Sequence, residues 1–135
     1  MGSWNVLQGD MNGKPIFIRV DTQWKESSRK TQYPYRIGIA IPLNNPNNDG
    51  LPSNDEMNIL NSIEDLIDKE LIQEGKTILT LIITTNSMRE FVLYTNIPKV
   101  IQSKYNVLKN KVKTHEVQMI IENDPKWEVY KSFLH

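Results

Sequence analysis

The chain has 135 residues, no cysteine, and sixteen basic against sixteen acidic side chains, so its formal net charge at neutral pH is zero. This length suits one domain with its own hydrophobic core, and a hydrophobic fraction of 39% argues against disorder. The lack of cysteine excludes disulfides, thiolate catalysis and cysteine-ligated zinc, while the balanced charge argues against a protein that grips nucleic acid through many phosphates. Neither a secretory signal nor a run of about 20 apolar residues is present, so we expect a cytoplasmic protein without a membrane segment.

The N-terminal third predicts strands separated by irregular segments. Residues 15–20 form an apolar strand, and the Asn12-Gly13 pair before it is typical of a hairpin turn, so residues 6–8 are expected to supply the partner strand. The polar stretch 25–32 is expected to be a loop. Residues 35–41 alternate strictly between apolar and other side chains, which predicts a further strand that Pro42 ends.

The middle of the chain predicts a helix and a hairpin. Ser53 opens the helix and Glu56 lies three residues on, which predicts a capping box, and Gly75 is a plausible stop. The apolar stripe of this helix comprises Ile59, Leu60, Ile63, Leu66, Ile67 and Leu71. The next strand, 77–85, is apolar on both faces and should be central in a sheet, with strand 90–95 as its hairpin partner.

The C-terminal third predicts a helix that starts at Pro98, a strand over 116–122, and a short final helix capped by Asp124. We therefore predict an α+β fold: a ferredoxin-like βαββαβ sandwich with an added N-terminal β-hairpin and a short C-terminal helix. Residues 1–135 form a single domain, divided into the hairpin and loop (1–32), the core (35–122) and the C-terminal helical segment (124–135). Both long helices should pack on one face of the sheet, and the N-terminal strands, the final helix or a second copy of the chain would cover the other.

Metal and catalytic signals are weak. The two histidines, His115 and His135, are not clustered and are expected at the surface. The loop before the first helix partly matches a calcium loop, but its charge is low, a strand precedes it and Pro52 interrupts it. The positions that match are Asn45, Asn47, Asp49, Gly50 and Glu56. We expect no metal, no cofactor and no catalytic residue.

Arginines inside strands are the first candidate binding groups. Arg19, Arg36 and Arg89, the last beside Glu90, either pack their stems and pair their heads or converge on one sheet face as an anion site. The second candidates lie near the C-terminus and would contact a partner. They are Lys104, Lys109 and Lys111 of the lysine-rich helix, together with Trp127 and Tyr130. Those lysines would either complement the acidic first helix or bind RNA weakly, although the strand that carries Glu90 departs from the aromatic signature of RNA-recognition modules.

Several stretches together resemble one family. They are residues 12–19, 33–36, 41–44, 49–52, 85–91 and 124–127. In combination they resemble the bacterial family named domain of unknown function 695, over nearly the whole chain. The resemblance implies no established activity. Some members of the family look like fusions to a domain similar to the ribonuclease E inhibitor of the regulator B type, which hints at a regulatory or binding role.

Three hypotheses follow from the sequence. The leading one is a non-catalytic binding or regulatory module that contacts an unidentified protein, or a second copy of itself as a homodimer. The second is a small-molecule or anion binder, or an enzyme, that uses the strand arginines. The third is a weak RNA binder that uses the lysine-rich helix.

Overall fold

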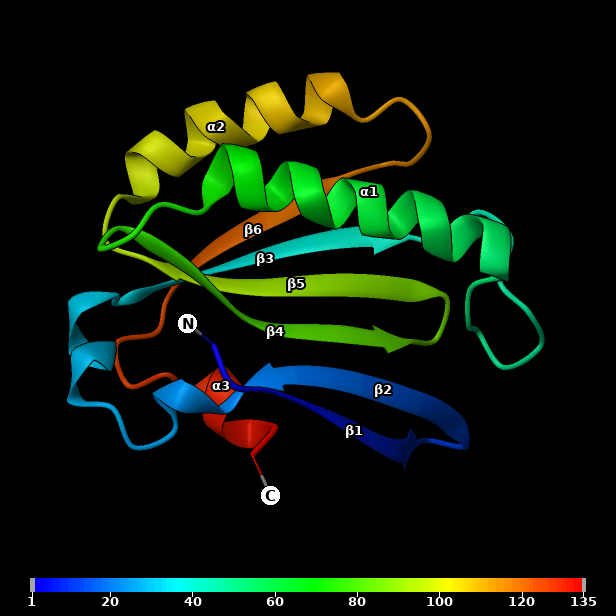
Figure 1. The fold of residues 1–135 in the computed structure, drawn as a ribbon, viewed down its shortest axis with the longest axis horizontal. Helices are drawn as coiled ribbons and strands as arrows, with labels where there is room; N and C mark the ends of the chain where they lie inside the picture. Colours follow the sequence, from blue (N-terminus) through cyan, green and yellow to red (C-terminus); the bar gives the residue numbers. More distant parts are fainter. Residues whose placement is uncertain (1, 135) are drawn as a thin grey trace.

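The computed structural model describes residues 2–134, so the ends of the predicted domain, Met1 and His135, lie outside the described residues. It has the predicted α+β class, with one six-stranded sheet (Figure 1). The strands are β1 (Trp4–Met11), β2 (Lys14–Asp21), β3 (Tyr35–Pro42), β4 (Thr77–Thr85), β5 (Met88–Thr95) and β6 (Gln118–Asn123). The helices are α1 (Asn54–Leu71), α2 (Pro98–Lys111) and α3 (Glu128–Ser132), with 3₁₀ helices η1 (Thr22–Trp24) and η2 (Ser28–Gln32).

The sheet has the order β1-β2-β4-β5-β3-β6, and every pair of neighbours is antiparallel. The predicted hairpin turn is confirmed, since Asn12 and Gly13 adopt φ angles of 53° and 83°, which an Asn-Gly pair tolerates. Strand β4 is central, as its sequence predicted. The N-terminal hairpin adds two strands beside β4 and thereby extends the sheet past the helices.

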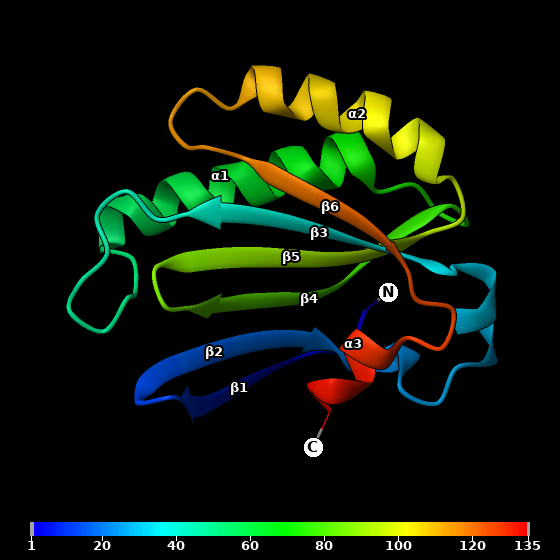
Figure 2. The same ribbon diagram turned by 180° about the vertical axis from the view of Figure 1, so that it is seen from behind.

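Both long helices cover the same face of the sheet and lie above the strands at the top of Figures 1 and 2. The alternating isoleucines of β3 pack there against Leu60, Ile63 and Ile67 of α1 and against Ile101 and Leu108 of α2. Strand β4 contributes Ile82 to this core. No helix among residues 2–134 is long and apolar enough to cross a membrane.

The opposite face is covered by aromatic side chains from η1, from the segment before β3 and from the C-terminal segment. Trp24 of η1 and Tyr33 pack with Trp127 and Tyr130 against the face of β2, β4 and β5 that points away from α1 and α2. Trp127 stacks on Tyr94 with ring centroids 4.0 Å apart. Of the three covers considered from the sequence, the C-terminal segment contributes to this cluster, together with Trp24 and Tyr33, whereas the N-terminal strands extend the sheet beside β4. Within the stretch 25–32 that was expected to be a loop, residues 28–32 form η2.

This packing corrects one sequence-based expectation. Trp127 and Tyr130 were candidate partner-binding residues, but both are 0% exposed. The indole Nε1 of Trp127 donates to the carbonyl of Tyr33, and the hydroxyl of Tyr130 donates to the carbonyl of Asp21. Both side chains are committed to the interior and present no surface to another molecule.

Candidate functional site

The four strand residues expected to converge on one site are divided between the two faces of the sheet. Arg36 and Glu90 lie on the face away from α1, where an ideal Cβ on Gly38 would come within 2.9 Å of the Glu90 carboxylate and 3.3 Å of the Arg36 guanidinium. Arg36 pairs there with Glu122 at 2.7 Å. Burial raises the pKa of Glu90, while the nearby Arg36 charge opposes that rise. A single site made of all four residues is thus excluded by geometry.

Arg19 and Arg89 lie on the other face, beneath α1, and are the pair that the fold brings together. Arg19 makes a two-pronged pair with Glu64 of α1, at 2.9 Å and 3.2 Å. Its guanidinium also lies 5.6 Å from the ring centroid of Trp4. The charge of Arg19 is therefore already balanced within the chain.

Arg89 is buried without such a partner. It is 6% exposed, and no ion pair among residues 2–134 includes it. Its Nε donates to the hydroxyl of Thr84, the residue opposite it in the β4–β5 hairpin, and its Nη2 lies 3.2 Å from the thioether sulfur of Met57. Burial lowers the pKa of the Arg89 guanidinium; Arg19 acts in the same direction and Glu64 opposes it. Because arginine stays protonated in proteins, this is a buried positive charge that lacks a carboxylate.

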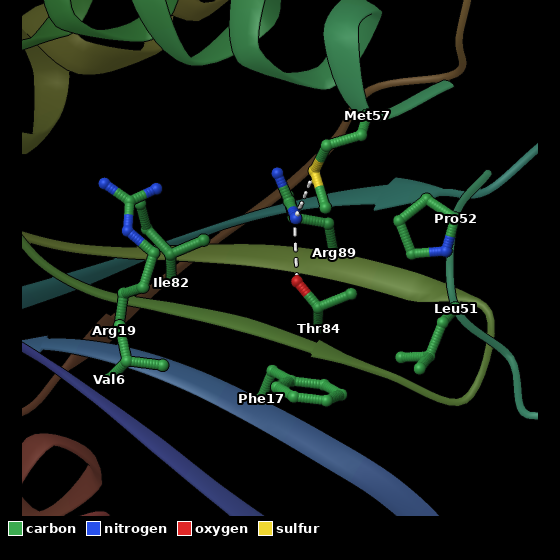
Figure 3. A pocket seen from close by; sticks show the side chains of 9 residues that line it. All are labelled: Val6, Phe17, Arg19, Leu51, Pro52, Met57, Ile82, Thr84 and Arg89. Atoms are coloured by element: carbon green, nitrogen blue, oxygen red, sulfur yellow. Dashed lines mark hydrogen bonds between the residues drawn. The ribbon is translucent and has the colours of Figure 1, made fainter. Parts of the chain in front are cut away.

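A cavity of about 340 Å³ opens beside Arg89 (Figure 3). Arg19, Arg89 and Thr84 are the polar side chains of its wall, and the remainder is apolar. Phe17 and Ile82 belong to the sheet, whereas Met57 comes from the first turn of α1. Figure 3 shows both guanidinium groups directed toward the helix layer.

The loop between β3 and α1 forms one end of this cavity through Leu51 and Pro52. Gly50 holds that loop against the β4–β5 turn, because its carbonyl accepts a hydrogen bond from the backbone N–H of Ser87 at 2.9 Å. Its φ is 78°, and a Cβ there would come within 2.8 Å of the same nitrogen. A glycine is therefore required at this point of close approach.

Sequence reasoning identified the two arginines of this site but missed its apolar wall. Phe17 was recognised only as part of a strand, and Leu51 and Pro52 only as part of a loop. Met57 lies outside the apolar stripe that predicted α1, and that offset was the one available signal that it faces something other than the main core.

The contacts of the loop depend on Asn47, whose side-chain oxygen accepts from the N–H groups of Asp49 and Leu51.

A second polar cluster lies at the start of α1 and corrects two expectations. Ser53 caps the helix through the N–H of Glu56, but the Glu56 carboxylate does not return to Ser53 as a capping box requires. It accepts instead from the N–H groups of Asn44 and Asn45 and binds Nε2 of His115 at 2.6 Å. The side chain of His115 is 1% exposed, so the expectation of a surface histidine was wrong.

Metal ligands do not gather in the part of the chain that the structure describes, where no group of three or more His, Asp or Glu side chains could hold an ion. His135 lies outside that part. In the loop that partly matches a calcium site, Glu56 is taken by His115 and by backbone donors, and Asn47 by the loop itself.

Of the three candidate lysines of α2, Lys111 contacts the neighbouring helix α1. Lys111 pairs with Glu70 at 2.8 Å, and Lys104 donates to Gln73 at 3.4 Å. Lys109 lies over the ring of Tyr105. The pair between Lys111 and Glu70 fits the interpretation that the two helices complement each other in charge, and such an exposed pair contributes little.

Comparison with known proteins gives a family but no activity. The model of the family described as Family of unknown function (DUF695) matches residues 2–135, so the chain belongs to this family. No curated protein and no solved structure matches the chain significantly.

Proposed function

Because a family without an assigned function supplies no activity, we propose from the cavity alone that this DUF695 domain is a non-catalytic binding module. Its ligand carries a carboxylate or similar anionic group on an apolar body. The observation that supports this proposal is Arg89, a residue only 6% exposed, whose guanidinium lines a cavity and has no carboxylate partner among residues 2–134.

The chemistry of the ligand follows from the wall. A guanidinium presents a planar fork of donors that matches a carboxylate or phosphate with two parallel hydrogen bonds. The volume of about 340 Å³ lies within the range of small-molecule sites. At roughly 30 Å³ per water-sized group, it accommodates about a dozen non-hydrogen atoms. Their apolar part would rest on Phe17, Ile82 and Leu51.

The side chains that line the cavity suit ligand binding better than catalysis. Its nine residues include two arginines and one threonine as the only polar side chains. A general acid or base needs a group such as His, Asp or Glu within hydrogen-bond reach, and an activated nucleophile needs a base beside it. The buried His115 and Glu56 belong to a separate cluster and do not line this wall.

The finer assignment of the fold is part of the same proposal. The order β4-β5-β3-β6 with α1 and α2 on one face supports a ferredoxin-like core over residues 35–122, to which the N-terminal hairpin is added. In this arrangement the hairpin extends the sheet past α1, and the cavity lies where that extension begins. Contacts with a protein partner, a homodimer and a cytoplasmic location stay predictions.

The test is a titration of the protein with carboxylates and their neutral amides. Octanoate, 4-phenylbutyrate and indole-3-acetate would each be compared with the corresponding amide by calorimetry and by amide chemical shifts. We expect at least one acid to bind, its amide to bind at least about tenfold more weakly, and shifts at Phe17 and Leu51.

A matched pair of variants makes the test specific. Arg89→Met removes the guanidinium from the cavity and should abolish the preference for acid over amide. Arg36→Met removes another buried strand arginine, on the opposite face, and should leave binding unchanged. Equal binding of acid and amide, binding by Arg89→Met at wild-type strength, or no binding of any of the three acids would each refute the proposal.

A further inference from the structure

A second cavity continues the first along α1. It also has a volume of about 340 Å³ and shares Arg19 as a lining residue with the first. Where the first cavity is mostly apolar, the second has the carboxylates of Glu64 and Asp68 in its wall, together with the ring of Trp4. The two cavities therefore meet at Arg19, whose side chain reaches from β2 to Glu64 of α1, and the surface that they form together along α1 is called the groove.

The geometry of α1 explains why both cavities lie along one side of this helix. Met57, Glu64 and Asp68 are separated by seven and four residues, so they lie on one stripe of the helix. Met57 lines the first cavity, and the other two line the second. This stripe forms the wall of the groove on the helix side.

The floor and outer side of the groove belong to the N-terminal hairpin. Phe17 and Arg19 are two residues apart in β2 and therefore point to the same face of the sheet. Val6 of β1 is paired with Arg19. Trp4 and Val6 are 39% and 71% exposed, since β1 and β2 extend beyond the edge of α1 (Figure 1). The groove thus has a helix on one side only and is open to solvent over the hairpin.

The two ends of the groove carry opposite charges. Arg89 provides a buried positive charge at one end. Asp68, at the other end, is exposed and takes part in none of the hydrogen bonds or ion pairs of residues 2–134. Eleven residues separate Met57 from Asp68, which corresponds to about 16 Å along a helix that rises about 1.5 Å per residue. An extended peptide covers that length with about five residues, at roughly 3.3 Å each.

We propose that the groove binds the C-terminal end of a peptide in an extended conformation. Its terminal carboxylate pairs with Arg89, its last side chain is apolar and fills the first cavity, and a basic side chain about four residues upstream reaches Asp68. This inference rests on the proposed anion site at Arg89.

The end of the first cavity favours a chain terminus over an internal acidic residue. Leu51 and Pro52 stand at that end, away from Arg19 (Figure 3). A peptide that enters over Arg19 and reaches Arg89 meets these two side chains, which favours a chain that ends at this point. A terminal carboxylate supplies the anion at the position where the peptide ends.

The experiment uses three synthetic peptides and three variants of the full chain. The first peptide is N-acetyl-lysyl-trialanyl-leucine with a free carboxylate, the second is its C-terminal amide, and the third has glutamine in place of the lysine. The variants are Arg89→Met, Asp68→Asn and, as a matched control, Asp65→Asn, which alters an exposed aspartate of the same helix that lines neither cavity.

We expect the free peptide to bind at least about tenfold more tightly than the amide, and Arg89→Met to remove this difference. Asp68→Asn should weaken the lysine peptide by about two- to fivefold and leave the glutamine peptide unchanged, as suits an exposed charge pair. Asp65→Asn should change the binding of neither the lysine peptide nor the glutamine peptide.

The outcomes separate the two proposals. If the simple carboxylates bind in an Arg89-dependent manner but the peptides do not bind, or the lysine gives no advantage that Asp68→Asn removes, the peptide inference is refuted and the anion site stands. If Arg89→Met leaves the binding of carboxylates and peptides unchanged, both are refuted.

Discussion

Replacing Glu56 by alanine should cost the domain much of its stability, although the residue lies in the first turn of a helix where glutamates are usually exposed. Glu56 is 4% exposed, and its carboxylate accepts three hydrogen bonds: from Asn44 N–H at 2.6 Å, from Asn45 N–H at 3.1 Å and from His115 Nε2 at 2.6 Å. Hydrogen bonds to a charged group contribute about 1.5–3 kcal/mol each, and removing one partner of a buried charged pair costs about 3–5 kcal/mol. We expect the free energy of unfolding to fall by about 3–5 kcal/mol and the Tm by roughly 10–20 °C.

The pH dependence gives this prediction a sign. Burial alone would raise the pKa of Glu56, but the hydrogen bonds from Asn44, His115 and Asn45 outweigh it and hold the pKa below its usual value of 4.5. A carboxylate whose pKa is lowered by folding stabilises the protein above the pKa of the unfolded chain, and this contribution is lost as the pH falls through the folded value. The difference between wild type and Glu56→Ala should therefore be constant from pH 7 to about 5 and shrink below about 4.5.

Urea unfolding followed by circular dichroism at several pH values would measure this difference. Asp65→Ala, which removes an exposed carboxylate from the same helix, is the control and should change stability by less than about 0.5 kcal/mol. A loss below about 1 kcal/mol for Glu56→Ala, or a loss that grows as the pH falls from 5 to 3, would refute the reasoning.

Three further substitutions test other parts of the structure by the same unfolding assay. Tyr94→Phe removes the hydroxyl that donates to Asp124 at 2.8 Å inside the aromatic core, and should cost about 1.5–3 kcal/mol; no loss would show that this hydrogen bond is not formed. Gly50→Ala places a Cβ 2.8 Å from the Ser87 nitrogen at a φ of 78°, and should cost at least about 1–2 kcal/mol; a stability equal to wild type would contradict the close approach. Arg89→Met should leave stability unchanged or raise it by about 1 kcal/mol, because it removes a buried charge that lacks a carboxylate; a loss above about 2 kcal/mol would assign Arg89 a structural role.

The regular elements were predictable because their signals are local. The apolar run of β4 fixed its central position, and the 3.6-residue stripe predicted α1. Glu56 shows where local reasoning ends. Its spacing from Ser53 predicts a capping box, yet three donors from distant segments compete for the same carboxylate and are better placed. Nothing in the sequence brings residue 115 within reach of residue 56.

The candidate site shows the same limit, with one signal that was available. Arg89 and Glu90 are neighbours in a strand, and neighbours in a strand point to opposite faces, so these two could never have met in one site. Only the strand register brings Arg19 close to Arg89. Arg19 of β2 is paired with Ile82 of β4, and Thr84, two residues further along β4, is paired with Arg89 of β5. One end of the apolar wall that turns the pair into a cavity, Leu51 and Pro52, comes from a loop whose course depends on the contact between Gly50 and Ser87.

The energetics of Arg89 connect the fold with the proposed function. Arg89 is only 6% exposed, so its guanidinium has lost much of its hydration, and a threonine hydroxyl and a thioether replace only part of it. The folded domain therefore carries a desolvation cost that its own side chains offset only in part, whereas Arg19, in the same cavity, is balanced by Glu64. A carboxylate ligand would supply the missing partner without further desolvation of the arginine. Binding should consequently raise the Tm of the wild type in the presence of the acid that binds best, and should leave the Tm of Arg89→Met unchanged.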